Sequence, residues 1–528
     1  MNNNKERERA ELHRTIWQIA NDLRGAIDGW DFKQYVLGML FYRFISENLE
    51  NHINTNQHEA GYPDFKYSEL SDEDAEYARK QVVDEKGFFI LPSELFSNVV
   101  KKAKTDKDLN MTLERVFRDI EGSAVGTPSE NSFKGLFDDI DVNSNKLGGT
   151  VVERNERLTK LMNAINGLQL GKYQDNTIDA FGDAYEYLMT MYAANAGKSG
   201  GEFFTPQEVS ELLARIAVID FTIEDKRNKE VINKVYDPCC GSGSLLLKFA
   251  KILGKDKVQQ GFYGQEINLT TYNLARINMF LHDISFDKFS IAHGDTLKNP
   301  YHEDDQPFDA IVSNPPYSIK WEGDSNPLFI NDERFAPAGI LAPKSKADMA
   351  FIMHMLHWLS PSGTAAIVCF PGILYRGGAE QKIRKYLVDN NYIDTIIQLP
   401  PDLFYGSSIS TIIMVLRKNK SNNKILFIDA SKEFVRIDTK NKLSSKNIKT
   451  ILDTIRFRKE EDYFSKYANQ KEVMNNHYNL SVNNYVSIED TKEVIDILQL
   501  NKEIKLTVEK VNKLRKEIDL IIEGLENG

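Results

Sequence analysis

Four residues that follow an apolar run could bind a planar amine. The run covers residues 308–312, and the four residues are Asn314, Pro315, Pro316 and Tyr317. Proline has a carbonyl group but no N–H, so this turn offers hydrogen-bond acceptors without competing backbone donors. The side-chain oxygen of Asn314 and the carbonyl of Pro315 could accept both protons of an NH₂ group and direct its lone pair at an electrophile. Tyr317 could stack on the ring that carries the amine.

The same four residues also fit an ordinary loop, because Asn-Pro and Pro-Pro pairs mark turns wherever they occur. A short motif is a hypothesis that needs structural context. The residues and elements around the turn therefore decide between an amine-binding site and a plain connection.

Three acidic residues upstream of this turn each lie at the end of a predicted strand. Glu266 comes 23 residues after Gly243, where an acidic side chain typically binds ribose hydroxyls in nucleotide-binding sheets. Asp295 could accept a hydrogen bond from the amine of a cofactor adenine. Asp237, at the mouth of a glycine-rich turn, would repel a phosphate but attract an ammonium or sulfonium group. Each carboxylate alone could be a surface acid or a helix cap, but three at successive strand ends favour a binding site.

The glycine-rich turn is the first of two segments that could surround a cofactor. Its glycines permit a tight bend and let a ligand approach the backbone closely. The turn lacks the complete G-x-G-x-x-G spacing, so by itself it is weak evidence. Its residues after the two cysteines are Gly241, Ser242, Gly243 and Ser244.

The second segment lies just before a predicted helix. Its residues are Glu202, Phe203, Phe204, Thr205, Pro206 and Gln207. We expect Thr205 to be the N-cap, with Pro206 at the first helical position and Glu208 completing a capping box. Capping does not explain the two adjacent phenylalanines. The electropositive helix N-terminus could bind the carboxylate of an amino acid, and the aromatic rings could close over it.

Strands and helices alternate through the region that contains these segments. The predicted strands are 231–236, 261–265, 289–292, 308–312, 364–370, 395–399 and 411–416. The predicted helices between them are 244–252, 269–282, 347–359 and 379–390. This alternation implies an α/β fold with a largely parallel sheet covered on both faces. Ligands bind at the carboxyl ends of the strands in such sheets.

Size and composition limit the possible functions. With 528 residues, the chain is expected to form roughly two to four domains. The net charge of −11 argues against a chain that grips a phosphate backbone without help. No apolar stretch approaches the roughly 20 residues that span a bilayer, and the charged N-terminus does not resemble a signal peptide, so we expect a cytoplasmic protein. Three cysteines suggest neither a disulfide framework nor a zinc site.

The regions around the α/β part are predicted to be helical and without catalytic clusters. Residues 1–165 read as a helical packing or partner-binding module. The basic run at 441–450 is expected to be an exposed loop. Beyond about residue 480, apolar residues recur at steps of three and four between Lys and Glu. This helix could pack on its own domain or form a seam with another subunit.

Taken in order, the segments EFFTP, DPCCGSGS, QEIN, HGD and NPPY resemble the motifs of DNA adenine-N6 methyltransferases that use S-adenosyl-L-methionine. In particular, the chain resembles the modification subunit of type I restriction-modification systems over nearly its whole length. The two cysteines in the glycine-rich turn are a mild departure, because such subunits often have small residues there. The backbone role of the turn does not depend on them.

The resemblance implies a doubly wound, mostly parallel Rossmann-like methyltransferase sheet between two helical regions. The expected domains are a helical N-terminal domain at 1–165, a methyltransferase domain at 166–478 and a helical, coiled-coil-forming tail at 479–528. It also implies that residues 202–207 with Ser242, Gly243 and Ser244 surround the methionine part of the cofactor. Asp237 and Gly241 are expected to bind the cofactor as well. Glu266 would bind the ribose and Asp295 the cofactor adenine.

The implied substrate is an adenine in double-stranded DNA, held by residues 314–317 after it has been flipped out of the helix. The sulfonium supplies the leaving group, so the protein's task is alignment and amine activation. The resemblance further implies that a separate specificity subunit reads the DNA sequence, which fits the acidic chain. Two copies of this chain would join one specificity subunit, and a restriction subunit would complete the complex. The C-terminal helix is the expected contact.

Three competing interpretations remain open. The Asn-Pro-Pro-Tyr turn also serves methyltransferases that act on glutamine side chains or on RNA bases, because each substrate presents a planar NH₂ group. A scaffold that keeps the fold without catalysis is a second alternative, which the intact acidic residues and turn argue against. The third is a metal hydrolase that uses His354 and His357, but these lack the third ligand that zinc requires.

Overall fold

The computed structural model describes residues 13–16, 31–168, 182, 184, 186–188, 205–221, 227–404, 408–437, 440–487 and 497–526. Of the predicted site residues, Glu202, Phe203 and Phe204 lie outside this set. The chain forms two compact units, which are residues 1–486 and 487–528. A search of the described helices finds none with the length and apolar character that crossing a membrane requires.

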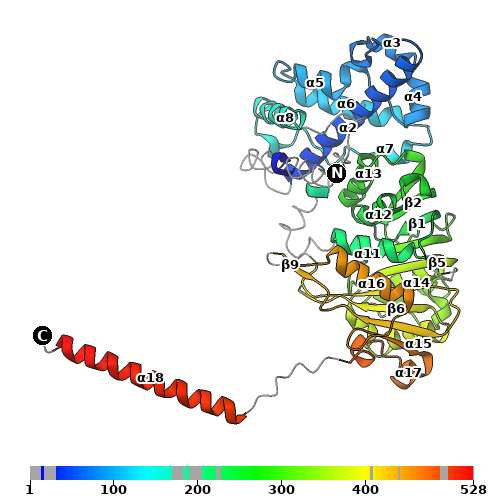
Figure 1. The fold of residues 1–528 in the computed structure, drawn as a ribbon. Helices are drawn as coiled ribbons and strands as arrows, with labels where there is room; N and C mark the ends of the chain where they lie inside the picture. The colour runs from blue at the N-terminus through cyan, green and yellow to red at the C-terminus, as the bar shows by residue number, and fades with distance from the viewer. Residues whose placement is uncertain are drawn as a thin grey trace. The chain divides into compact units, whose positions relative to one another are not determined.

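The N-terminal region of the first unit is helical, as the sequence predicted, and Figure 1 shows it in blue and cyan. Its long helix α2 buries one continuous run of large side chains, including Phe41 and Tyr42, against the shorter helices. These helices are α2 (Asp31–Glu59), α3 (Asp72–Glu76), α4 (Arg79–Lys86), α5 (Phe96–Lys102), α6 (Leu109–Ser123), α7 (Glu130–Phe133) and α8 (Val151–Asn166).

Within the described residues, one nine-stranded sheet forms the centre of the α/β region, with the strand order β11-β8-β6-β7-β5-β4-β1-β2-β3. Strands β1 to β5 pair in parallel with one another, whereas β7 runs antiparallel between β5 and β6. The strands are β1 (Ile232–Asp237), β2 (Val258–Glu266), β3 (Phe289–His293), β4 (Phe308–Ser313), β5 (Leu359–Cys369), β6 (Ile393–Gln398), β7 (Ile412–Leu416), β8 (Lys424–Asp429) and β11 (Ser465–Asn469).

Helices cover both faces of this sheet, because alternate side chains of its apolar strands point to opposite sides. Helices α11, α12, α13 and α16 pack on one face, and α14, α15 and α17 pack on the other. Their bounds are α11 (Gln207–Ala217), α12 (Ser244–Leu253), α13 (Leu269–Leu281), α14 (Asp348–Trp358), α15 (Ala379–Asp389), α16 (Ser445–Phe457) and α17 (Gln470–Asn475). The predicted doubly wound, mostly parallel fold is confirmed.

Helix α13 joins the sheet to the N-terminal helices. The buried guanidinium of Arg276 donates to the carbonyls of Asn131 and Lys134, at 3.1 and 2.9 Å. Asn273 and Thr270 donate to the two carboxylate oxygens of Asp139, at 2.9 and 3.0 Å. These bonds fix the N-terminal region on the helix that follows the Glu266 strand.

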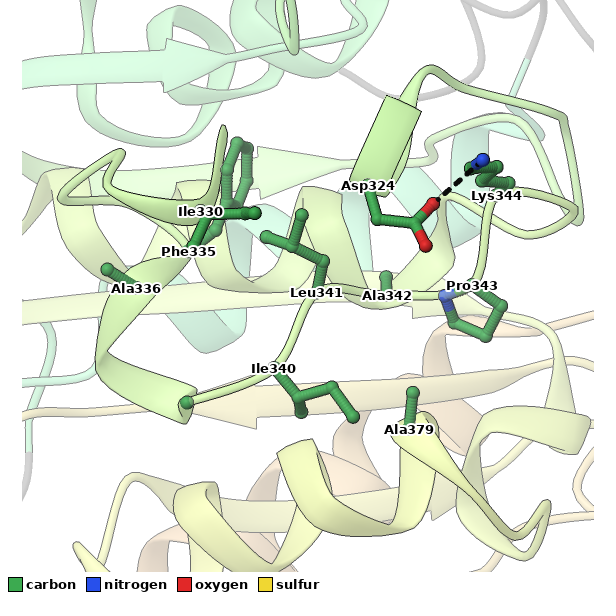
Figure 2. Close-up of a pocket in the computed structure, with 11 residues that line it drawn as sticks. Asp324, Ile330, Phe335, Ala336, Ile340, Leu341, Ala342, Pro343, Lys344 and Ala379 are labelled. Carbon is green, nitrogen blue, oxygen red and sulfur yellow. Dashed lines mark ion pairs between the residues drawn. The ribbon is translucent and has the colours of Figure 1, made fainter. Parts of the chain in front are cut away.

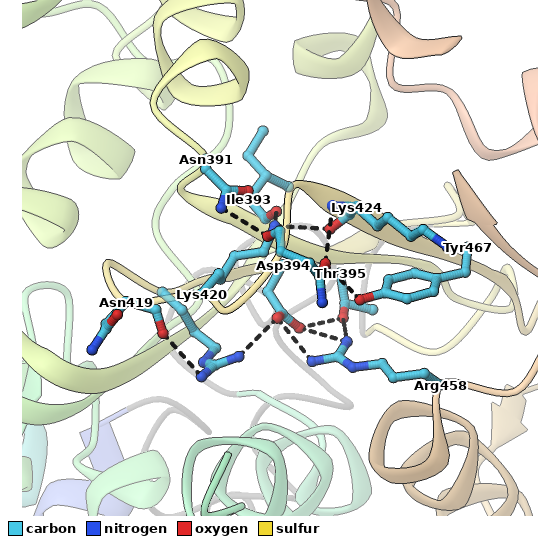
Figure 3. Close-up of polar contacts among 11 residues, drawn as sticks. Asn391, Ile393, Asp394, Thr395, Asn419, Lys420, Lys424, Arg458 and Tyr467 are labelled. Carbon is cyan, nitrogen blue, oxygen red and sulfur yellow. Dashed lines mark hydrogen bonds and ion pairs between the residues drawn. The ribbon is translucent and has the colours of Figure 1, made fainter. Parts of the chain in front are cut away.

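A buried ion cluster holds the start of β6, at the edge of the sheet opposite the carboxyl ends of the parallel strands. The Asp394 side chain is 2% exposed and accepts two hydrogen bonds of 2.8 Å from Arg458, as Figure 3 shows. Arg417 donates a third at 3.1 Å. Burial alone would raise the pKa of Asp394, but the two guanidinium groups hold it well below its usual range. The cluster ties three segments of the chain together.

Sequence patterns missed several elements after β7. Strands β8 and β11 were not predicted, and they extend the sheet beyond β6. The basic run at 441–450 is not a loop. It contains the end of the hairpin formed by β9 (Val435–Ile437) and β10 (Lys440–Lys442), followed by the start of α16. In the second compact unit, the predicted C-terminal helix is present as α18 (Ile497–Glu526).

Candidate active site

The predicted site residues gather at one edge of the sheet because their strands run in parallel. Asp237 at the end of β1 pairs with Gly264 of β2, and Glu266 at the end of β2 pairs with His293 of β3. Strand β4 is parallel to β1 on its other side, so the turn at Asn314 leaves the same edge. The tertiary structure therefore brings the acidic strand ends and the Asn-Pro-Pro-Tyr turn to one edge.

The glycine-rich turn is shaped by left-handed backbone and by close packing. Gly243 is the N-cap of α12 with φ 76°, and a Cβ atom there would lie 3.1 Å from Cε of Met279. A side chain at this position would therefore strain the backbone and crowd α13. Asn278 of α13 donates to the carbonyl of Ser242 at 2.7 Å, and the hydroxyls of Ser242 and Ser244 lie 2.9 Å apart.

Asp237 lies beneath this turn and not at its mouth, where the sequence placed it. The residue is 1% exposed, and its Oδ1 accepts from the backbone N–H of Cys239 at 3.0 Å and the hydroxyl of Ser313 at 2.7 Å. Burial, together with the nearby carboxylate of Glu266, raises the pKa of Asp237 to about 7. Its observed contacts connect the glycine-rich turn to the end of β4.

The other two acidic residues hold backbone groups at the same edge. Glu266 is half-buried and accepts from the N–H of Gly241 at 3.0 Å and of Asn268 at 2.8 Å. Burial raises the pKa of its carboxyl, and these backbone donors oppose the shift. Asp295 accepts from the N–H of Leu297 at 2.9 Å. Both carboxylates thus shape the loops in which a ligand could bind.

Asn314 is held at both ends of its amide. Its Nδ2 donates to the hydroxyl of Thr205 at 3.2 Å, across 109 residues of sequence. Its Oδ1 accepts from the hydroxyl of Tyr317 at 2.6 Å. Burial raises the pKa of Tyr317 well above its ordinary value, so the phenol is a proton donor at neutral pH. The acceptor oxygen that the sequence assigned to an amine is therefore occupied by a hydroxyl of the same turn.

Asp348 supports the turn from the start of α14. Its two carboxylate oxygens both accept from the backbone N–H of Ser318, each at 3.1 Å. Ser318 has φ 52°, so this contact holds a residue in the left-handed region directly after Tyr317. The sequence patterns did not point to Asp348, Ser313 or Asn278. The only local signal was a single polar residue, Ser313, between an apolar strand and the turn.

The helix that follows the predicted aromatic segment starts differently from the prediction. Helix α11 begins at Gln207 with Pro206 as N-cap and has no side-chain cap, so the expected capping role of Thr205 was wrong. The Thr205 hydroxyl instead contacts Asn314. Both amide atoms of Gln207 are buried and lack a hydrogen-bond partner in the part of the chain that the structure describes. This amide at a helix N-terminus is therefore a group whose hydrogen-bonding capacity a bound polar ligand would satisfy.

A cavity of about 600 Å³ lies between the segment that joins β4 to α14 and the start of α15. Figure 2 shows residues that line it. Its lining includes Phe335, Leu341 and Ala379, and an ion pair of 3.0 Å joins Lys344 to Asp324 at its rim. None of the predicted site residues lines it. The acids and the Asn-Pro-Pro-Tyr turn, and not this cavity, define the candidate site.

His354 lies on α14, and its side chain is fully buried in the protein core. Its Nε2 is 3.0 Å from the hydroxyl of Tyr236, and its Nδ1 is 3.4 Å from the guanidinium of Arg334. Burial and the nearby cations lower the pKa of His354 well below its ordinary value. Across the described residues, no group of three or more His, Cys, Asp or Glu side chains could hold a metal ion.

Two family models match separate parts of the chain. The model described as N-6 DNA Methylase matches residues 176–494, and the model described as HsdM N-terminal domain matches residues 12–165. The first match contains the whole sheet and every candidate site residue.

Individual known proteins are similar to this chain over nearly its whole length. The methylase subunit of the type I restriction enzyme MpnII from Mycoplasma pneumoniae is 49% identical, covering 100% of this chain and 98% of that protein. The structure of a type I restriction-modification methyltransferase subunit from Streptococcus thermophilus is 35% identical with a TM-score of 0.80, covering 91% of this chain and 100% of that chain. A chain from a type I R-M system shares the fold at 18% identity and a TM-score of 0.64, covering 96% of this chain and 99% of that chain.

Proposed function

The chain belongs to the N-6 DNA methylase family, and we propose that it is the modification subunit of a type I restriction-modification complex. It is accordingly a DNA methyltransferase specific for the N6 amine of adenine. The observation that carries the assignment of the site is the Asn314 amide, fixed after β4, whose neighbour β1 ends at Asp237 and is followed in the sheet by β2, which ends at Glu266. The amide oxygen is an acceptor of the kind that a planar amine requires.

The family implies S-adenosyl-L-methionine as methyl donor, and the residues at the strand ends fit it. The unpartnered amide of Gln207 at the start of α11 suits the amino-acid end, and Ser242, Gly243 and Ser244 would lie beside the same part. Glu266, at the end of β2, is assigned to the ribose and Asp295 to the adenine. When bound, the cofactor supplies a methyl group on a positively charged sulfur.

Asp237 supports this binding site from below. Its contacts with Cys239 and Ser313 position the glycine-rich turn relative to β4. The Asp237 side chain is almost fully buried, so direct contact with the cofactor is not its main role in the proposal. The proposal retains Glu202 beside the methionine part and Phe203 and Phe204 as the rings that close over the amino-acid end.

The target adenine would take the place that the Tyr317 hydroxyl now holds on Asn314. The amine would donate to Oδ1 of Asn314 and to the carbonyl of Pro315, and Pro316 would keep the turn free of a competing N–H. Tyr317 would turn its ring to stack on the flipped base, which offsets part of the cost of extrusion. Thr205 positions the amide by accepting from Nδ2, so the oxygen faces the amine.

The proposed complex contains two copies of this chain and one specificity subunit, with a restriction subunit added for cleavage. Support comes from the full-length similarity to a methylase subunit of a type I restriction enzyme. The net charge of −11 agrees with DNA recognition by another chain. The proposal places the enzyme in the cytoplasm, where its DNA substrate lies.

We divide the chain into the helical domain at 1–165, the methyltransferase domain at 166–478 and the tail at 479–528. The two family-model matches at 12–165 and 176–494 support the first boundary. The first compact unit extends to Val486, and Tyr485 stacks on Phe427 of β8 with ring centroids 3.8 Å apart. The part of the tail that would contact the partner therefore starts after Val486.

A methyl-transfer assay tests this function against its nearest rivals. The chain and a specificity subunit would be given methyl-labelled cofactor and, in separate reactions, duplex DNA, transfer RNA and protein substrates. We expect label in N6-methyladenine of duplex DNA that contains the target sequence. Label on glutamine or RNA with none on DNA adenine would overturn the proposal. Absence of transfer to any substrate despite cofactor binding would favour the scaffold interpretation.

A further inference from the structure

A basic segment interrupts the acidic chain immediately after β8. Between residues 432 and 449 there are six basic residues and two acidic ones, a net charge of +4 in a chain whose total is −11. The basic residues are Lys432, Arg436, Lys440, Lys442, Lys446 and Lys449, and the acidic ones are Glu433 and Asp438. None of the residues assigned to the candidate site lies in this segment.

Three of these lysines form one exposed surface. Lys442 ends the hairpin strand β10, and Lys446 and Lys449 lie three residues apart, on one face of the first turns of α16. All three are exposed, and none makes an ion pair with another part of the chain that the structure describes. Their charges are therefore available to an anionic partner.

The surface is held rigidly at the base of the hairpin. Asn441 donates to the carbonyl of Pro401 at 2.8 Å, which ties β10 to the loop after β6. Asn447 of α16 donates to the carboxylate of Glu433 at 2.7 Å, which ties the helix to the start of the hairpin. The capping box of Ser444 and Asn447 fixes the start of α16. The lysines are thus presented by ordered backbone.

Strand directions place this surface at the same edge of the sheet as Asn314. Strand β8 is parallel to β6, and β6 and β5 are both antiparallel to β7, so β8 ends where β4 and β5 end. Four strand spacings separate β8 from β4, which is about 19 Å. Roughly five or six phosphates of one DNA strand cover that distance.

The surface also lies near the cofactor side of the site. Burial raises the pKa of Glu208 in the first turn of α11, and the charge of Lys442 opposes this shift. Helix α11 starts two residues after Thr205, the partner of Asn314. Helix α16 packs against α11. A duplex whose flipped base reaches Asn314 would therefore pass close to these lysines.

We propose that Lys442, Lys446 and Lys449 form a phosphate-binding surface that holds duplex DNA beside the base-binding turn. The inference rests on the proposed function, and it adds a DNA contact made by this chain to the sequence recognition made by its partner. Lysine contacts to phosphate carry no sequence information, so the surface positions the duplex without reading it. The exposed side chains of Val435 and Ile437 on the same hairpin could instead favour a protein partner, and the experiment separates the two.

The test compares the salt dependence of DNA binding by the complex of the full chain with its specificity subunit, without cofactor. Each phosphate contact adds about 0.9 to the slope of log affinity against log salt. Replacing the three lysines by glutamine should make the slope shallower by about 2.7 for each copy of the chain, which is about 5.4 for a complex with two copies, and should raise KM for DNA in methyl transfer. The matched triple arginine variant should keep the wild-type slope.

A control variant replaces Lys101, Lys102 and Lys104 of the N-terminal region by glutamine, and it should leave the slope unchanged. An unchanged slope in the Lys442, Lys446 and Lys449 variant would overturn the proposal. So would loss of the specificity subunit on size exclusion, because the surface would then bind protein. The slope reports phosphate contacts without methyl transfer, so a complex that binds DNA but never methylates contradicts the proposed function alone.

Discussion

Asn314 is the residue on which the proposed chemistry of the site depends. Its amide is held by Thr205 on one side and Tyr317 on the other. We expect Asn314→Ala to lower the rate of methyl transfer by roughly two orders of magnitude or more, because the amine loses its aligned acceptor. Cofactor affinity, measured by calorimetric titration, should stay nearly unchanged.

Two other variants complete that experiment. Asn390→Ala changes an exposed asparagine after α15 and should retain full activity. Glu266→Ala should weaken cofactor binding, since its carboxylate is assigned to the ribose and also holds the N–H of Gly241. Retained methyl transfer by Asn314→Ala would refute its role as amine acceptor.

The hydrogen bond between Thr205 and Asn314 can be tested separately. If its hydroxyl positions the Asn314 amide, Thr205→Val should lower kcat about tenfold, the effect of one lost hydrogen bond of about 1.4 kcal/mol. Thr205→Ser keeps the hydroxyl and should restore kcat. Steady-state kinetics distinguish this role from cofactor binding, because a pure binding role would raise KM for the cofactor with kcat unchanged.

The buried carboxyl of Asp237 predicts a pH effect on stability. Its folded pKa is about 7, above the value of about 3.9 in an unfolded chain. Between these two values the folded state binds more protons, so this group's contribution to the free energy of unfolding falls as pH rises. Asp237→Asn removes that contribution while keeping an oxygen for Cys239 and Ser313.

Urea unfolding at several pH values measures this effect. Asp237→Asn should gain stability relative to wild type as pH rises from about 4 to about 7, by at most about 1.4 kcal/mol per pH unit. Above pH 7 the difference should level off. Parallel stability profiles of the two proteins would show that the carboxyl does not titrate in this range.

At the scale of elements, the Asp394 cluster holds β6, β7 and α16 together. Removing one member of a buried ion pair leaves an uncompensated charge, which costs roughly 3–5 kcal/mol. We expect Asp394→Asn to lower the free energy of unfolding by about that amount, because Arg458 and Arg417 lose their shared partner. Chemical denaturation followed by circular dichroism checks this.

The surface pair of Asp389 and Lys385 on α15 is the matched control. Its carboxylate is 37% exposed, and exposed pairs contribute at most about 1 kcal/mol. Asp389→Asn should therefore have a small effect. If both variants lost the same free energy of unfolding, burial would not be what determines the contribution of the Asp394 cluster to stability.

At the scale of the whole molecule, helix α18 carries an apolar surface. No other described element of the second compact unit covers it. Seven apolar residues at steps of three and four are each 50–77% exposed: Ile504, Val508, Val511, Leu514, Ile518, Ile521 and Leu525. Monomeric proteins rarely leave such a contiguous apolar stripe exposed. Its period is that of a helical seam with another subunit.

Deleting residues 487–528 should therefore impair assembly before it alters the fold. We expect the shortened chain to lose co-purification with the specificity subunit while its melting temperature stays close to that of the full chain, because the first compact unit ends at Val486. A variant with Val511 and Ile518 changed to glutamate should behave in the same way. Unchanged co-purification would count against the helix as the contact.

Sequence patterns alone determined the class of the fold and suggested the residues of the proposed site. Strands with alternating helices, acids at the strand ends and the turn at Asn314 are local features, because periodicity and turn chemistry depend on neighbouring residues. For the same reason the sheet was recognised from β1 to β7. The pattern did not predict β8 and β11, whose place depends on pairing with strands far away in the sequence.

Only the tertiary structure decided which polar groups meet. The contacts from Asn314 to Thr205 and from Ser313 to Asp237 join residues 109 and 76 positions apart, and no local pattern encodes them. Thr205 was expected to cap a helix, and Asp237 was expected at the mouth of the turn. The capping prediction failed because α11 starts later, and the placement of Asp237 failed because neighbouring strands bury its carboxyl. Side-chain partners depend on how strands are ordered in the sheet, which is a long-range property of the chain.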